Sequence, residues 1–407
     1  MDACLSVLGI THPLLQAPMA GVSTPAMAAA VSEAGGLGGI ALGASDGAQA
    51  ATMIAETRAR TDRPFNVNLF VHAPPRRDAA VEAAWCEALR PAFAEQGAEP
   101  PVRLHAIYPS FAEDDAMLTL LRQARPAVVS FHFGLPDAAR IAALKAAGCL
   151  LLASVTSLAE AQAASSAGID MLVAQGYEAG GHRGIFDPDS PDDRLGTLAL
   201  TRLLAVQGHR PVIAAGGIMD GAGVSAVLAL GAVAAQLGTA FIACPESAAD
   251  AGYRAALMGE GASHTVMTRA ISGRPARCLA NRFTALGATL SVQVPDYPVA
   301  YDAGKALNAA AKARGESGYG AQWAGREHPW RERCRRGIWC ERSRGRCRGV
   351  AFDFAQAERS EGPFLCVPTS VQPERSRRPR DKASAPARRA GAGRAQACSA
   401  SSRARSS

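Results

Sequence analysis

The sequence predicts an α/β fold, a (β/α)8 TIM barrel followed by a small covering domain and a disordered C-terminal tail. Eight short apolar runs alternate with stretches of helical period, and most of these runs are almost wholly apolar. Parallel strands that are buried on both faces have this composition. Several helical stretches end at a glycine, which is a common helix stop. Eight strands with seven helices between them fit one closed parallel barrel better than an open sheet.

The predicted elements of the barrel follow one another in alternation. We expect strands at residues 14–17, 37–42, 65–70, 127–133, 149–155, 170–175, 211–216 and 233–238. We expect helices at residues 24–34, 46–59, 78–95, 136–147, 157–167, 196–207 and 221–230. Each strand with the helix after it makes one unit of the barrel, so the barrel occupies residues 1–242.

The helical and strand periods are lost after the eighth strand. Residues 243–305 contain the turn-rich segments PES, SGRP and PDYP. Because this stretch is too long for a tight connection, it predicts a small domain that covers a substrate. Helical period returns at residues 306–322, so we expect a C-terminal helix within 306–325 that returns to the barrel.

The composition, with 48% apolar and 19% charged residues, favours a globular protein. No apolar run reaches the roughly 18 residues of a membrane-spanning helix, and the N-terminus lacks the features of a secretory signal. We therefore expect a cytoplasmic protein without a membrane partner. Residues 326–407 hold 20 Lys and Arg against 8 Asp and Glu, a balance of +12, so residues 1–325 carry −5 of the total +7. An acidic body predicts no nucleic-acid partner.

The tail beyond Gly325 has a different composition. Arg, Ser, Pro and Cys dominate residues 326–407 and apolar periodicity disappears, which predicts disorder. Back-translated with GC-rich codons and read one nucleotide earlier, the segment from Arg326 to Cys340 gives QGAPLARALPAGHLV, an apolar-periodic helix. We interpret the tail as the product of a frameshift near residue 325. The alternative is a natural Arg-rich appendage that binds nucleic acid or acidic partners. Its cysteines lack the close pairing of zinc sites, so we expect no metal.

Barrel enzymes carry their active sites at the C-terminal ends of the strands, so the residues just past the apolar runs are the candidates. The first strand ends in residues 16–21 (QAPMAG), whose small residues expose the backbone for a flat ring. The third strand carries Asn68, an amide that either binds such a ring or satisfies a loop backbone. The fourth strand ends in residues 132–134 (HFG), where His132 is either a satisfied core residue or part of a pocket.

The sixth strand leads into the most specific feature of the chain, the segment QGYEAGGHRG at residues 175–184. Its four glycines permit tight turns and the close approach of a ligand. They hold His182 and Arg183 at the predicted mouth of the barrel. Imidazole is the side chain best suited to take a proton near neutral pH. We therefore interpret His182 as a positioned base.

The seventh and eighth strands end in residues 214–218 (AAGGI) and 236–239 (QLGT). Barrels often build a phosphate site from the loops after these two strands, and backbone N–H groups in glycine turns suit a dianion. A phosphate-bearing cofactor is therefore expected. Further along, Tyr297, Tyr301 and Lys305 are spaced by four and share a face if the segment is helical. They either close over a small anionic substrate or form a surface stripe.

Together the QAPMAG, HFG, EAGGHRG, AAGGI and QLGT elements resemble the nitronate monooxygenases, formerly called 2-nitropropane dioxygenases, over residues 5–325. The resemblance implies non-covalently bound FMN, with candidate contacts at Met19, Asn68, Gln175, Gly180, Gly217, Gln236, Gly238 and Thr239. It implies that His182 is the catalytic base. Positions that line the substrate pocket in the first class of the family are matched by Tyr108, His132, Tyr253, Tyr297, Tyr301 and Lys305. The Tyr-x3-Tyr-x3-Lys element favours that class over the quinone-reductase branch.

The resemblance implies that an alkyl nitronate, such as propionate-3-nitronate, is oxidised by O2 to a carbonyl compound and nitrite without a nicotinamide. A neutral nitroalkane would first give its α-proton to His182. The expected partners are a small nitronate and O2, and the expected assembly is a monomer or homodimer. Two alternatives remain: an FMN- and NAD(P)H-dependent reductase of quinones or enoyl thioesters on the same barrel, and an inactive product of a frameshifted gene.

Overall fold

The computed structural model describes residues 2–326, 338–343 and 346–352. All of them belong to one unit, residues 1–361, and a second unit, residues 362–407, lies outside the described residues. The predicted disorder and frameshift of the tail therefore fall mostly outside them. The described part of the tail forms an antiparallel hairpin of β12 (Ile338–Ser343) and β13 (Arg346–Phe352), and disorder in the rest of the tail stays a prediction. Both segments contain aromatic or β-branched residues of high strand propensity.

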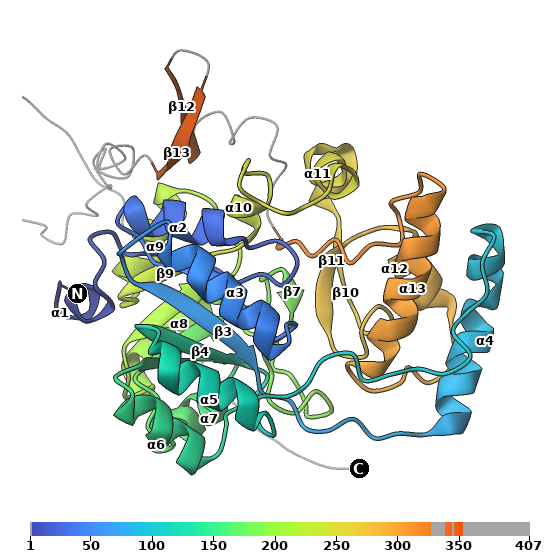
Figure 1. Ribbon diagram of the computed structural model, residues 1–407, viewed down its shortest axis with the longest axis horizontal. Coiled ribbons are helices and arrows are strands. Elements are labelled where there is room, and N and C mark those ends of the chain that lie inside the picture. The colour runs from blue at the N-terminus through green and yellow to red at the C-terminus, as the bar shows by residue number, and fades with distance from the viewer. Residues whose placement is uncertain (1, 327–337, 344–345, 353–407) are drawn as a thin grey trace, which may run out of the picture. The chain divides into compact units, whose positions relative to one another are not determined.

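Eight parallel strands form the barrel, in the order β1-β9-β8-β6-β5-β4-β3-β2, and the α/β barrel prediction is confirmed (Figure 1). The strands are β1 (Leu14–Gln16), β2 (Gly38–Ala41), β3 (Phe65–Phe70), β4 (Val128–His132), β5 (Leu150–Val155), β6 (Met171–Gln175), β8 (Val212–Ala215) and β9 (Ala234–Leu237). A parallel bridge between Leu15 and Leu37 closes the sheet, with Gln16 N donating to the Leu37 carbonyl at 2.9 Å.

The strands are apolar because both of their faces are buried. Along β5, Leu151 packs in the cluster under the surrounding helices, whereas its neighbour Leu152 packs with Val173 and Ile213 in a separate cluster. Successive side chains of a strand point to opposite faces, so the second cluster fills the barrel interior. The barrel is therefore a packed core, and a ligand has room only at its ends.

The barrel helices are α2 (Pro25–Glu33), α3 (Gly47–Arg58), α5 (Asp115–Ala124), α6 (Ala138–Ala146), α7 (Leu158–Ser166), α8 (Thr197–Gln207) and α9 (Gly221–Ala229), and a short α1 (Asp2–Leu8) precedes β1. Most of them begin at a side-chain cap. Asp46, Asp137 and Ser157, for example, each accept a backbone N–H of the first turn. Several end before a glycine with positive φ, such as Gly148 and Gly168, as the sequence predicted.

Helix α4 (Ala79–Glu95) was expected between the third and fourth strands of the barrel, and this placement is wrong. In Figure 1 it lies beside α13 (Val299–Ala313), away from the strands. Its apolar face carries Trp85 and Phe93, which are fully buried with Phe283 in a separate apolar cluster. The place between β3 and β4 is taken by α5, whose shorter apolar face packs on the barrel through Met117 and Leu121.

We call α4 and residues 251–313 the cap. Besides α4 and α13 it contains α11 (Ala251–Met258), a 3-10 turn (Glu260–Ser263), β10 (Thr265–Thr268), β11 (Ala276–Leu279) and α12 (Arg282–Thr289), and α10 (Thr239–Ile242) leads from β9 toward it. Strand β11 pairs on one side with β10 and on the other with β7 (Gly181–His182). Because β7 follows β6 directly, the cap sheet is joined to a barrel loop.

The last helix of the cap does not occupy the predicted range, residues 306–325. Helix α13 begins at Val299, after Pro298, and ends at Ala313, shortly before Gly315 with a φ of 78°. Its buried face packs within the cap and not on the barrel. The chain returns to the barrel through the non-helical residues 323–325, where Gly325 N donates to Thr239 Oγ1 at 3.0 Å. No helix within the described residues has both the length and the apolar character needed to cross a membrane.

Candidate active site

A cavity of about 520 Å³ lies at the carboxyl ends of the barrel strands, between the barrel and the cap. Its volume is typical of pockets that hold a cofactor or small ligand. All fifteen residues singled out in the sequence line it. The ends of the barrel strands and the segments that follow them contribute Met19, Asn68, Tyr108, His132, Gln175, Gly180, His182, Gly217, Gln236, Gly238 and Thr239. The cap contributes Tyr253, Tyr297, Tyr301 and Lys305.

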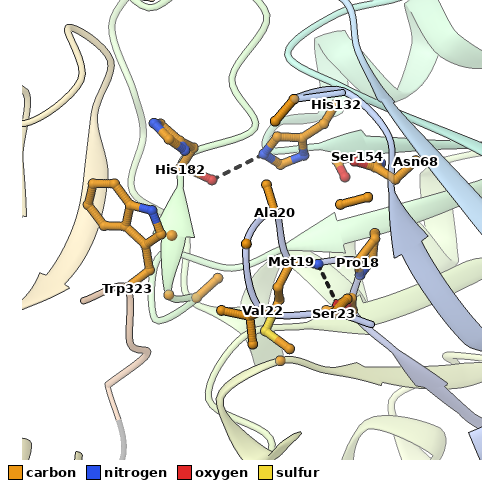
Figure 2. Close-up of a pocket in the computed structure, with 18 of the residues that line it drawn as sticks. Pro18, Met19, Ala20, Val22, Ser23, Asn68, His132, Ser154, His182 and Trp323 are labelled. Atoms are coloured by element: carbon orange, nitrogen blue, oxygen red, sulfur yellow. Dashed lines mark hydrogen bonds between the residues drawn. The ribbon is translucent and has the colours of Figure 1, made fainter. Parts of the chain in front are cut away.

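The loop after β1 is fixed by the buried amide of Gln16. Its Oε1 accepts from the N–H of Gly39 at 2.8 Å, and its Nε2 donates to Ser23 Oγ at 2.8 Å. Ser23 Oγ in turn accepts from the N–H of Met19 at 2.9 Å (Figure 2). The chain reverses at Gly21, whose φ is 75°. The backbone around Met19 is therefore held in place by the protein itself.

Two amides of β3 share one hydroxyl group of β4. Nδ2 of Asn66 and Nδ2 of Asn68 each lie 2.9 Å from Ser130 Oγ, and Asn68 Nδ2 also lies 3.2 Å from the Ser130 carbonyl. Asn68 and Ser130 line the cavity, whereas Asn66 does not. The neighbouring strand therefore satisfies the buried amide of Asn68 and orients it toward the cavity.

Gln175 uses both ends of its amide to hold the loop that carries His182. Its Nε2 donates to the His182 carbonyl at 2.9 Å, and its Oε1 accepts from Gly184 N at 2.7 Å. Gly184 has no room for a side chain, because a Cβ there would lie 2.9 Å from the imidazole of His132. Arg183 points away from the cavity and forms a buried ion pair with Asp192 at 2.9 Å. The arginine of this motif therefore supports the loop, and the histidine faces the cavity.

His132 lies at the cavity wall and contacts the same loop. Its Nε2 lies 3.2 Å from the His182 carbonyl oxygen (Figure 2). A carbonyl only accepts, so this bond requires a proton on Nε2 and leaves Nδ1 as the acceptor. Burial lowers the pKa of His132 to about 4, so the ring is neutral at physiological pH. The next residue, Phe133, has a φ of 79°, a strained backbone conformation that is concentrated at functional sites.

His182 lies on β7, opposite Ala276 of the cap strand β11. Its ring is surrounded by aromatic rings, with centroids of Tyr297, Tyr301 and Trp323 at 5.4, 6.0 and 5.0 Å. Burial lowers the pKa of His182 to about 3, with smaller contributions from His132 and the positive charge of Arg274. The imidazole is therefore neutral at physiological pH and has a nitrogen lone pair that can accept a proton.

The loops after β8 and β9 form tight backbone turns on the other side of the cavity. Gly217 has a φ of 63°, and Gly238 directly precedes Thr239 at the start of α10. At Gly180, in the loop between β6 and β7, a Cβ would lie 2.5 Å from the backbone of Gly325, so residues 324–325 cross that loop at close range. Such glycine turns present backbone N–H groups that suit a phosphate.

The cap supplies phenol groups and one ammonium group. Tyr301 and Lys305 lie on α13, but Tyr297 precedes it, so the prediction that all three share a helix face is wrong for Tyr297. Pro298, which follows Tyr297, is the N-cap of the helix. Lys305 Nζ lies 4.9 Å from the ring centroid of Tyr108 and 5.8 Å from that of Tyr301. Burial raises the pKa of Tyr297 and Tyr301, so both hydroxyl groups remain hydrogen-bond donors.

Trp323 is a cavity residue that sequence reasoning missed. In Figure 2 its indole lies beside His182. Its ring centroid lies 6.4 Å from that of Tyr301, and its carbonyl accepts from the hydroxyl group of Tyr253. Residues 323–325 (WAG) end the region that resembles the family, but no spacing linked Trp323 to the other site residues. Only the crossing of residues 323–325 over the barrel mouth brings the indole to His182.

The family model and the curated relatives give the same family. The profile of the family described as nitronate monooxygenase matches residues 2–335. A nitronate monooxygenase of Paraburkholderia phytofirmans is 63% identical over 324 residues, which cover 79% of this chain and 88% of the relative. One of Pseudomonas aeruginosa is 55% identical over 325 residues, which cover 80% and 93%.

Solved structures agree with this assignment. The nitroalkane oxidase of Streptomyces ansochromogenes has a TM-score of 0.71 and 39% identity, with 79% of this chain and 91% of that chain covered. FabK of Thermotoga maritima follows with a TM-score of 0.60 and 29% identity over 80% and 88% of the two chains. The family profile, the identity to both curated relatives and the barrel with its cavity lead to one conclusion. This chain belongs to the nitronate monooxygenase family.

Proposed function

We propose that this protein uses FMN and O2 to oxidise an alkyl nitronate to a carbonyl compound and nitrite. Its curated relatives at 63% and 55% identity carry the name nitronate monooxygenase. The observation that carries the proposal is the arrangement around His182. A neutral, half-buried imidazole faces a cavity whose cap side supplies phenol donors and an ammonium group.

The residues at the barrel mouth fit FMN. The glycine turns at Gly217 and Gly238, together with Thr239, lie after the two strands that commonly bind phosphates in barrels. The ring system would be held by Met19, Asn68, Gln175, Gly180 and Gln236, which line the remaining barrel wall. When bound, FMN accepts the electrons that leave the substrate. We assign flavin binding to the barrel, residues 1–242, and substrate cover to residues 243–305 together with α4.

The cap side of the cavity suits a small anion. Tyr297 has a buried hydroxyl group without a hydrogen-bond partner among the described residues, and Tyr301 stays protonated because burial raises its pKa. A buried polar group of this kind costs stability unless a ligand satisfies it. Lys305 supplies a positive charge at the same wall. The nitro oxygens of a nitronate carry the negative charge that these donors would bind.

The low pKa of His182 favours the nitronate over the neutral nitroalkane as substrate. An imidazole with a pKa of about 3 is a weak base, so it removes the α-proton of a nitroalkane slowly. A nitronate has already lost that proton and needs no base. Trp323 and the cap phenols surround the histidine with aromatic rings. The preferred substrate is therefore the anion, with propionate-3-nitronate as the candidate.

Anaerobic mixing of FMN-loaded protein with propionate-3-nitronate, followed at flavin wavelengths, tests the proposal. We expect the flavin absorbance to change before oxygen is admitted and nitrite to appear afterwards. If the flavin stays oxidised with the nitronate but bleaches with NADH, the protein is a reductase of quinones or enoyl thioesters. If the purified protein binds no FMN, the alternative hypothesis holds, namely that the chain is the inactive product of a frameshifted gene.

A further inference from the structure

The hydroxyl group of Ser272 contacts the ring of His182 from outside the cavity. Ser272 Oγ lies 2.8 Å from His182 Nε2, and Ser272 is fully buried and does not line the cavity. It belongs to the turn between β10 and β11, in the SGRP segment of the cap. Neither the spacing of the motifs nor the resemblance to the family drew attention to this residue.

The turn that carries Ser272 is rigid. Gly273 has a φ of 92°, its N–H donates to the Arg269 carbonyl at 2.8 Å, and a Cβ there would lie 2.5 Å from the backbone around Tyr297. Arg274 is buried with its guanidinium 4.4 Å from the ring centroid of Phe133, and it donates to the Phe186 carbonyl at 3.2 Å. The serine hydroxyl group is therefore held at a fixed place against the imidazole.

The hydrogen bonds around Ser272 select one tautomer of His182. Ser272 Oγ also lies 3.4 Å from the Arg274 carbonyl oxygen, which only accepts, and this weak contact is satisfied only when the hydroxyl proton points to that carbonyl. The oxygen lone pair then accepts a proton from His182 Nε2. This leaves Nδ1 unprotonated, and none of the described residues forms a hydrogen bond with Nδ1. Nδ1 is then the nitrogen that can accept a proton, on a ring that lines the cavity.

We propose that Ser272 is a positioning residue that holds His182 in the Nε2–H tautomer and thereby makes Nδ1 the base for neutral nitroalkanes. In this step the α-proton of the nitroalkane moves to Nδ1. The electron pair of the C–H bond forms the C=N bond, and the negative charge moves onto the nitro oxygens to give the nitronate. The imidazolium keeps its Nε2–H bond to Ser272 Oγ, which stabilises the new positive charge. The inference rests on the proposed function.

A matched pair of substrates, nitroethane and its anion ethylnitronate, distinguishes a positioning role of Ser272 from a purely structural role. Nitroethane must lose a proton to His182, whereas ethylnitronate has already lost it. For Ser272→Ala we expect kcat/KM with nitroethane to fall about tenfold to a hundredfold, because Nε2–H loses its buried partner. With ethylnitronate we expect a change of less than about twofold. Ser272→Thr restores the hydroxyl group and the nitroethane rate. Ser165→Ala, which removes a hydroxyl group on α7, serves as the control.

Equal losses with both substrates, or no loss with either, would overturn the proposal. A second measurement does not depend on turnover. The 15N chemical shifts of the His182 ring in the FMN-loaded wild-type protein, assigned with a His182→Gln variant, report which nitrogen carries the proton. We expect a protonated Nε2 and an unprotonated Nδ1, and the reverse would overturn the proposal. If the wild type oxidises neither substrate, the proposed function fails, but the tautomer still decides the role of Ser272.

Discussion

The two walls of the cavity are built from different kinds of groups. The barrel wall consists largely of backbone turns and amides at the ends of hydrogen-bonded strands, such as Gly217, Asn68 and Gln175. The cap wall consists of side chains, with Tyr297 and Lys305 as examples, supported by an apolar cluster that is separate from the barrel. The barrel wall therefore suits the binding of a cofactor by backbone groups. The side chains of the cap wall can be substituted, and the substrate preference altered, without a change in the barrel.

His182 lies where the two walls meet, and its substitution has the largest expected effect. Its side chain can change while its carbonyl keeps the bonds from Gln175 and His132. For His182→Gln we expect kcat/KM with nitroethane to fall about 10²–10⁴-fold, the contribution of a general base. With ethylnitronate the loss should remain below about tenfold. Steady-state kinetics with both substrates decide this, and equal losses would mean that the histidine acts through binding alone.

Substitutions in the apolar core of the cap should lower the stability of the protein and leave the affinity for the cofactor unchanged. Trp85 on α4 is fully buried in the cap cluster. For Trp85→Ala we expect the free energy of unfolding to fall by about 3–5 kcal/mol, measured by denaturant titration. Trp85→Phe should cost much less, because the indole N–H has no partner among the described residues. A large loss of FMN affinity in folded Trp85→Phe protein would argue against separate roles for the two walls.

Lys305 should act on the substrate alone. Its ammonium group lies over the rings of Tyr108 and Tyr301 on the cap side of the cavity. For Lys305→Met we expect KM for propionate-3-nitronate to rise about tenfold with kcat changed less than about threefold, because uniform binding of the anion is lost. Lys305→Arg keeps the charge and should retain most of the affinity. An unchanged KM in Lys305→Met would remove the lysine from the anion site.

The pH dependence of stability should give the smallest effect. The pKa values of His132 and His182, about 4 and about 3 in the folded protein, lie below the ordinary 6.5. The unfolded chain therefore binds more protons as the pH falls below 6.5, so their contribution is complete above pH 6.5 and is lost toward pH 4. We expect the melting temperature to fall by a few degrees over this range. His132→Asn should make the decline shallower, and an unchanged slope would contradict this assignment.

The barrel and its wall of the cavity were largely predictable from sequence, whereas the cap was not. Strands buried on both faces leave continuous apolar runs, and the residues that follow them must lie at one end of the barrel. Asn68 and Gly217 could therefore be placed on the cavity before the structure was known. The cap combines α4 with residues 251–313, segments far apart in sequence, and no local pattern reports that pairing.

The contacts of His182 were also not predictable from the sequence. His182 stood out because glycines surround it, but Ser272 and Trp323 reach it from segments about 90 and about 140 residues further along the chain. A serine in a turn and a tryptophan near a composition change have no spacing that links them to a histidine. Their roles follow only from the pairing of β7 with β11 and from the crossing of residues 323–325 over the barrel mouth.

The most direct test of the division between the two walls compares one variant from each. We would measure the Kd for FMN and, at saturating FMN, the KM for propionate-3-nitronate in Gly217→Val and Lys305→Met. Because Gly217 has a φ of 63° at the predicted phosphate turn, its substitution should raise the Kd for FMN at least about tenfold and leave KM within about twofold. Lys305→Met should do the reverse. If both variants change both constants alike, the cavity is one undivided site and the account is wrong.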